Sequence, residues 1–244
     1  MKKLLTIISL TAAASMAGGH AQLIWNPDNF TEGTDYLVAG WNFNDDTSLA
    51  TQLAVSHGTG TMTTNWISAN VKDFGGTTTN SYSSDAAGRD IALQAGGTDG
   101  NPANDGNWIQ FQFDLTNLEG LVMTYAAQAT QSAGSYHGLL DNTWSYSLNG
   151  VDFIDFTTVQ HVVNMDVGTV TVDFSSVTAL TNQSSVFIRN TMTTQVGQDP
   201  VTASGNNRFD NFQFQASAVP EPGTWALIGI GSMLMLWRSR RRLA

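Results

Sequence analysis

Hydrophobic and polar residues alternate along much of the chain between residues 37 and 214. In the segment 108–113, Ile109, Phe111 and Phe113 fall on one face of an extended strand, opposite Trp108 and the glutamines Gln110 and Gln112. Similar patterns predict further strands over residues 37–43, 121–129, 144–148, 153–163, 169–174, 186–189 and 209–214.

Helical patterning is weak in the same region. No stretch between residues 23 and 218 carries a 3.6-residue apolar stripe over more than two turns, and Asn149-Gly150 between two strands indicates a tight hairpin turn. About nine or ten short strands joined by polar turns predict an all-β fold, an antiparallel β-sandwich of the jelly-roll type. Residues 75–88 and 95–107, rich in Gly, Ser, Thr and Asn, are predicted to be long loops.

The two ends of the chain have a different composition. Lys2 and Lys3 precede an apolar segment, 4–16, and small residues occupy the −3 and −1 positions before Gln22, which predicts a signal peptide over residues 1–21. Cleavage after Ala17 is the alternative. The β-sandwich is then expected over residues 22–218, followed by a C-terminal segment, 219–244.

That C-terminal segment has three parts in a fixed order. Pro220-Glu221-Pro222 comes first and blocks any helix from extending backwards. An uncharged run bracketed by two tryptophans predicts a short transmembrane helix over residues 224–237, about 20 Å long against the ~30 Å hydrocarbon core. Basic residues follow and favour a cytoplasmic end; they are Arg238, Arg240, Arg241 and Arg242.

This order of motif, helix and arginine cluster resembles the PEP-CTERM sorting signal of Gram-negative bacteria. The resemblance implies export through the Sec translocon, transient anchoring in the inner membrane, and removal of the tail by exosortase, a membrane-embedded protease-transpeptidase. It also implies a final location at the cell surface or in the extracellular matrix, where carriers of this signal are associated with exopolysaccharide.

Charge and cysteine content exclude several functions for the region between the two signals. Residues 23–218 hold four basic and nineteen acidic residues, a net charge of −15, which disfavours nucleic acid and anionic lipid as partners. The chain has no cysteine, so disulfides, thiolate metal sites and cysteine nucleophiles are excluded.

Three short phrases carry a second, weaker resemblance. The segments 41–45, 146–153 and 207–212 are similar to jelly-roll domains of extracellular bacterial proteins, including sandwiches like carbohydrate-binding modules. The resemblance implies that the first and last strands are neighbours and share a structural calcium ion.

Calcium requires several converging oxygen ligands, which these two strands could supply. Asn44, Asp45 and Asp46 follow the first predicted core strand, and Asp210 lies in the last. The alternative is that these acids and amides form turns and interact with solvent. The loop from Asp99 to Asn107 also holds acids and amides, but its spacing does not match an EF-hand.

Catalytic motifs are few, and we expect no enzyme activity. The mature histidines His57, His137 and His161 lack metal-ligand spacing, and no Gly-x-Ser-x-Gly elbow or phosphate-binding loop occurs. A glycosidase needs two suitably placed acids, and Glu32 and Glu119 are the mature glutamates that precede the tail.

Sugar binding has a more specific candidate. Trp108 shares a polar strand face with Gln110 and Gln112, and an indole among amides is how a glycan-binding platform would look. The alternative is that Trp108 packs under the preceding loop. Three hypotheses follow: a non-catalytic structural module of a surface protein, a glycan-binding or exopolysaccharide-binding module, and a secreted hydrolase.

Overall fold

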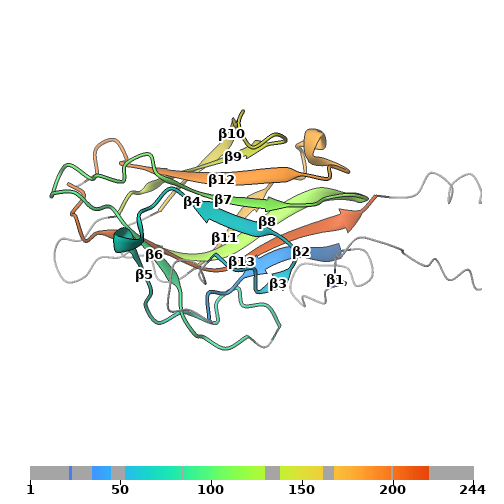
Figure 1. Ribbon diagram of the computed structural model, residues 1–244, viewed down its shortest axis with the longest axis horizontal. Helices are drawn as coiled ribbons and strands as arrows, with labels where there is room; N and C mark the ends of the chain where they lie inside the picture. The colour runs from blue at the N-terminus through green and yellow to red at the C-terminus, as the bar shows by residue number, and fades with distance from the viewer. Residues whose placement is uncertain are drawn as a thin grey trace, which may run out of the picture.

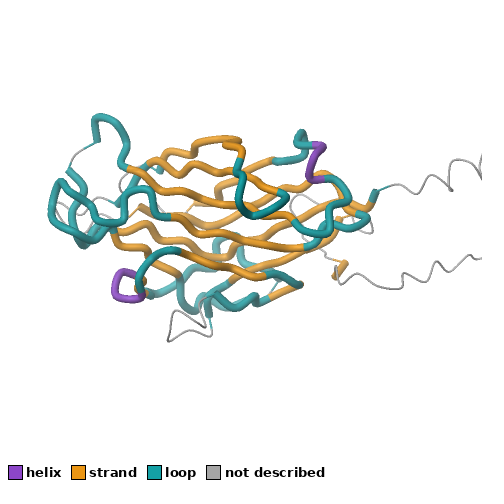
Figure 2. The backbone as a smooth tube through the Cα atoms, turned by 45° about the horizontal axis from the view of Figure 1, so that its top comes forward, coloured by secondary structure: helices purple, strands orange, loops and turns teal. Residues whose placement is uncertain are grey.

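The computed structural model describes residues 22–23, 35–44, 53–83, 85–129, 138–161, 168–198 and 200–219. Within them two antiparallel sheets pack face to face (Figure 1), and helical structure is limited to two 3-10 turns, Ser68–Asn70 and Thr178–Leu180. The antiparallel β-sandwich predicted from the alternation is confirmed. Loops gather at the two ends of the strands (Figure 2).

The larger sheet, sheet A, is built around the last strand. β13 (Asn206–Ala218) pairs with β8 (Leu118–Ala129) along one side, and with β2 (Asp35–Trp41) and β6 (Ile91–Gln94) along the other. The first core strand and the last strand are therefore neighbours. The remaining strands are β11 (Gly168–Asp173) beside β8, β1 (Gln22–Leu23) and β3 (His57–Gly58) beside β2, and β5 (Val71–Lys72) beside β6.

The smaller sheet, sheet B, has the order β10-β9-β12-β7-β4. Its strands are β10 (Ile154–Gln160), β9 (Asp141–Ser147), β12 (Val186–Thr193), β7 (Trp108–Phe113) and β4 (Thr61–Thr64). β7 has the predicted bounds, and side chains along β12 alternate between buried and half-buried, as expected for one face on the core and one in water.

Aromatic rings fill the space between the sheets. Phe111 of sheet B lies with its ring centroid 4.9 Å from both Phe212 and Phe214 of β13 and 5.0 Å from Trp41 of β2. Fully buried aromatic side chains of this size account for much of the hydrophobic stabilisation of a domain. Because this core closes between strands of residues 22–219, we expect those residues to fold on their own.

Two expectations need correction or remain open. Asn149-Gly150 does not form a two-residue turn, because β9 ends at Ser147 and β10 begins at Ile154; the residues between them form a longer loop. The signal peptide, the Pro-Glu-Pro motif, the C-terminal helix and the arginine cluster lie outside the described residues. Among the described residues, no helix is long and apolar enough to cross a membrane.

Candidate functional site

The outward face of sheet B carries the residues that the alternation placed there. Ile109, Phe111 and Phe113 are buried in the core, whereas Trp108 and Gln110 are half-buried and Gln112 is exposed. Trp108 therefore does not enter the core. The strand register places Thr191 opposite Trp108, Arg189 opposite Gln110 and Phe187 opposite Gln112.

Arg189 joins two aromatic rings on this face. Its guanidinium carbon lies 3.6 Å from the ring centroid of Phe153 and 4.5 Å from that of Trp108. Its Nε and Nη2 donate to Oε1 of Gln110 at 3.1 and 2.7 Å. Trp108, Arg189 and Phe153, with Gln110, form what we call the aromatic–arginine cluster; attraction between a guanidinium and aromatic rings contributes roughly 0.5–1 kcal/mol per exposed contact.

The loop between β9 and β10 brings Phe153 to this cluster. Oγ of Ser147 accepts the backbone N–H groups of Asn149 and Gly150. Oδ1 of Asn149 accepts those of Val151 and Asp152. Gly150 has φ +73°, and a β-carbon there would lie 3.0 Å from the ring of Phe187. The loop is therefore compact and lies directly over the outward face of sheet B.

The rest of the outward face is mainly small and polar. Hydroxyl side chains project from β4, β9, β10 and β12 around the aromatic–arginine cluster, and the Oγ1 atoms of Thr143 and Thr158 lie 3.0 Å apart. These residues are Thr61, Thr63, Thr143, Thr158, Thr191 and Thr193. The surface thus offers aromatic planes together with many hydrogen-bonding groups.

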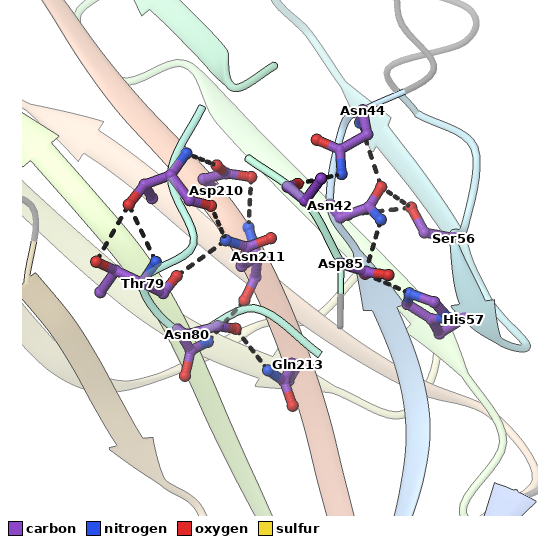
Figure 3. A network of polar contacts seen from close by, with 12 residues as sticks. Asn42, Asn44, Ser56, His57, Thr79, Asn80, Asp85, Asp210, Asn211 and Gln213 are labelled. Atoms are coloured by element: carbon purple, nitrogen blue, oxygen red, sulfur yellow. Dashed lines mark hydrogen bonds and ion pairs between the residues drawn. The ribbon is translucent and has the colours of Figure 1, made fainter. Parts of the chain in front are cut away.

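On sheet A, a long segment, residues 73–90, crosses the outward face of β13 and is held there by polar side chains (Figure 3). Nδ2 of Asn211 donates to the backbone oxygens of Thr77 and Thr79 at 2.8 and 2.9 Å, and Nδ2 of Asn80 donates to the backbone oxygen of Asn211 at 2.7 Å. Nε2 of Gln213 donates to the oxygen of Asn80 at 2.6 Å. We call this segment the strap.

The far part of the strap is held against β2 and β3. Oδ2 of Asp85 lies 2.6 Å from Nε2 of His57 and accepts Nδ2 of Asn42 at 2.8 Å (Figure 3). The ring of Tyr82 lies 4.5 Å from that of His57. The hydroxyl of Ser56 donates to Asn42 rather than to His57, so these residues do not form a Ser-His-Asp triad.

Two of the predicted calcium ligands, Asn44 and Asp210, contact the same strap. Asn44 follows β2; its Oδ1 accepts the N–H of Arg89, and its Nδ2 donates to the oxygen of Ala86. Asp45 and Asp46 lie outside the described residues. The described part of the chain has no group of three or more His, Cys, Asp or Glu side chains arranged for a metal ion.

Asp210 and Asp90 line a pocket of about 130 Å³ between the strap and sheet A. Asp90 is ion-paired with Arg208, which also donates to Gln128 and to the backbone oxygen of Gly75. Burial raises the pKa of Asp90, and it raises the pKa of Asp210 to about 7. Asp90 accepts the backbone N–H of Phe74, and Asp210 accepts those of Thr77 and Asn211. Both carboxylates therefore hold the strap against sheet A.

The long loop 95–107 uses its acids in a similar way. Oδ1 of Asp99 accepts the N–H of Ala203, and Oδ1 of Asp105 accepts the N–H of Thr194. Asn104 is buried and donates to the oxygen of Gln94. These side chains tie together the loops at one end of the sandwich, as turn-forming residues do.

Comparison with known proteins identifies the sorting signal. The PEP-CTERM protein-sorting motif matches residues 218–242, so the chain carries the signal predicted from its Pro-Glu-Pro, helix and arginine order. The motif marks an exported surface protein of the exosortase-dependent class. A search of curated proteins found no match.

Solved structures with similar architecture include sugar-binding and adhesin domains. The CBM22-1 xylan-binding domain of Paenibacillus barcinonensis Xyn10C is 13% identical over 75% of this chain and 96% of that one, with a TM-score of 0.39. The K3 cleaved adhesin domain of Lys-gingipain from Porphyromonas gingivalis w83 is 14% identical over 73% and 98%, with a TM-score of 0.39.

Proposed function

We propose that this exported surface protein binds polysaccharide without catalysis, through the outward face of sheet B. The observation that carries the proposal is the aromatic–arginine cluster, in which Trp108 and Phe153 flank Arg189 on a face otherwise lined with hydroxyl and amide groups. Aromatic planes offer the apolar faces of sugar rings a contact surface, while a small number of placed polar groups fix orientation.

Two further features support binding over catalysis. The outward face of sheet B consists largely of threonine, serine and glutamine, and its two acids, Asp141 and Asp155, do not face each other across the strands. Asp155 pairs with Ser145, four residues along β9 from Asp141, so roughly 13 Å of strand separates the two acids, more than a glycosidase pair spans. The two buried carboxylates of sheet A, Asp90 and Asp210, are engaged by Arg208 and by backbone amides. A hydrolase would need an acid and a second carboxylate free to act on the substrate.

The proposal is tested by affinity electrophoresis of residues 22–219 in gels containing neutral and acidic polysaccharides, including exopolysaccharide from the native host. We expect retardation in at least one gel. Trp108→Ala should weaken that binding by about tenfold, as truncation of a central aromatic contact does. Because Trp108 is half-buried and lies on the outward face, its removal should leave the protein folded, which thermal unfolding followed by circular dichroism checks.

A matched control exists on the other sheet. Phe74 is 41% exposed and lies 5.2 Å from the guanidinium carbon of Arg208, so Phe74→Ala removes an aromatic–arginine contact away from sheet B. This variant should bind polysaccharide as the wild type does. Absence of retardation in every gel would leave a purely structural module, and release of reducing ends from a bound polymer would indicate a hydrolase.

A further inference from the structure

Arg189 of the aromatic–arginine cluster differs from the other described arginines in its ion pairing. Arg89 lies 3.0 Å from a carboxylate oxygen of Asp73, and Arg208 is ion-paired with Asp90. Among the described residues, Arg189 has no carboxylate partner, and its hydrogen bonds go to the neutral amide of Gln110. In a region of net charge −15, an arginine left without an acid is a specific feature of this face.

The guanidinium of Arg189 is held in one orientation with part of its edge free. Gln110 accepts from Nε and Nη2, and the guanidinium carbon lies over the rings of Trp108 and Phe153. Nη1 of Arg189 has no hydrogen-bond partner among the described residues and is not a buried atom, so it is accessible to solvent. A guanidinium fixed in this way presents a pre-organised fork for a planar, two-oxygen group.

The acid nearest along the strand register does not neutralise this charge. The row that crosses sheet B at Arg189 runs from Thr63 through Gln110 and Arg189 to Ser145 and then Asp155. Asp155 is exposed on the edge strand β10, and two strand spacings, about 10 Å of backbone, separate it from Arg189. No ion pair joins the two side chains. Asp152, the acid next to Phe153 in the loop, accepts from Nδ2 of Asn149 at 2.8 Å and is not ion-paired with Arg189.

From this geometry we infer that the outward face of sheet B selects polysaccharides that carry carboxylates, as uronic-acid sugars do. Arg189 binds a carboxylate of the polymer through its free N–H groups, while Trp108 and Phe153 contact the adjoining sugar rings. The inference rests on the proposed function and specifies its ligand class. The net negative charge of the domain repels a polyanion at long range, so the selectivity is a short-range property of Arg189.

The test compares acidic polymers with chemically matched neutral ones. Polygalacturonate, alginate and hyaluronan are each used beside a carboxyl-reduced form, in which the carboxylate has become a hydroxymethyl group on the same backbone. Binding of residues 22–219 is measured by affinity electrophoresis and titration calorimetry. We expect at least one acidic polymer to bind about tenfold more tightly than its reduced form, which corresponds to about 1.4 kcal/mol.

Variants assign the preference to Arg189. Arg189→Gln should reduce binding of the acidic polymer to the level of the reduced form, and Arg189→Lys should keep only part of the preference because an ammonium lacks the planar fork. Arg89→Gln makes the same charge change at an exposed, paired arginine and should keep the preference. The comparison of the acidic and reduced polymers uses the wild-type protein alone, so it remains valid even if a variant fails to fold.

The outcomes separate the two proposals. Equal binding of acidic and reduced polymers, or a preference for the reduced form, overturns the selectivity and leaves the proposed function standing. Strong competition by poly-glutamate as well as by uronic acid would show recognition of carboxylate without sugar, which also overturns it. If no polymer of any kind binds, the proposed function fails and the selectivity fails with it.

Discussion

The backbone N–H of Thr77 donates a 2.8 Å hydrogen bond to Oδ2 of Asp210, which joins the strap to the last strand of the sandwich. Oδ1 of the same carboxylate accepts the N–H of Asn211. Asp210 is 3% exposed, and a β-carbon on Gly76 would lie 2.7 Å from its Oδ2, so the strap packs closely over the carboxylate. Because the strap removes the Asp210 carboxylate from water, the contact also disfavours the charged form of this group.

The first prediction concerns pH and Asp210. Its pKa is raised to about 7 in the folded state from an ordinary value of 3.8, mainly by burial, so the folded state holds the proton more strongly. Stability contributed by this group is therefore fully present below about pH 4 and is lost as pH rises towards 7. Relative to Asp210→Asn, the wild type should lose up to about 1.4 kcal/mol per pH unit in that window.

Urea unfolding of both proteins at several pH values between about 4 and 8 gives this difference directly. Because both proteins share all other titrating groups, the effects of those groups on the free energy of unfolding cancel in this difference. A difference that stays constant across the window, or one of the opposite sign, would contradict a raised pKa for Asp210.

Calcium binding near Asp210 stays a prediction. If Asn44, Asp45, Asp46 and Asp210 bind the ion, then a hundredfold excess of calcium over its dissociation constant should stabilise the folded state by about 2.7 kcal/mol. Asp210→Asn should remove that increment. Thermal unfolding with added calcium and with EDTA measures it, with magnesium as the comparison ion. An unchanged melting temperature in EDTA would leave these residues with their role in holding the strap.

His161 should give the opposite pH dependence. It is 1% exposed, its Nδ1 has no partner among the described residues, and burial lowers its pKa from 6.5 to about 4. The folded state therefore disfavours the protonated ring, and stability is lost as pH falls from about 6.5 towards 4. Relative to His161→Phe, the wild type should lose about 3 kcal/mol over this window.

Phenylalanine suits this test because the imidazole already packs beside the rings of Tyr125 and Phe209, with centroids 6.3 and 5.6 Å away. Urea unfolding curves of both proteins at about pH 6.5 and pH 4 measure this difference. If the variant and the wild type respond to acid identically, His161 does not titrate as its burial requires.

Sorting provides the last prediction. β13 pairs with β8 up to Ala218, and the N–H of Val219 donates to the oxygen of Asn117, so the matched sorting motif begins at the final residue of the last strand. We expect protein released from the native host to lack the arginine-rich end. Intact-mass measurement of the released form tests this, and a main product that still carries residues 238–244 would contradict it.

Replacing Arg238, Arg240, Arg241 and Arg242 by serine should reduce processing, because the basic end is predicted to hold the tail in the membrane before cleavage. The processed and unprocessed forms can be separated by mass in the same cultures. Processing at the wild-type rate in this variant would mean that the arginines are not required.

Local pattern was enough to predict the sheets and one face of the candidate site. A strand turns alternate side chains to opposite faces, so the order of Trp108 to Phe113 alone separated the buried residues from Trp108, Gln110 and Gln112. Short strands such as β4 and β6 were missed, because four residues carry too little alternation to stand out from a loop. The sorting signal was readable because it is contiguous.

The tertiary structure decided which outward-facing residues meet. Period-two alternation assigns a face but not a neighbour; the pairing of β12 with β7 places Arg189 beside Gln110, and the loop after β9 adds Phe153. The strap likewise reaches Asp210 across 133 residues of sequence. Strand register and loop packing depend on contacts between distant segments, and no local pattern of polar and apolar residues contains them.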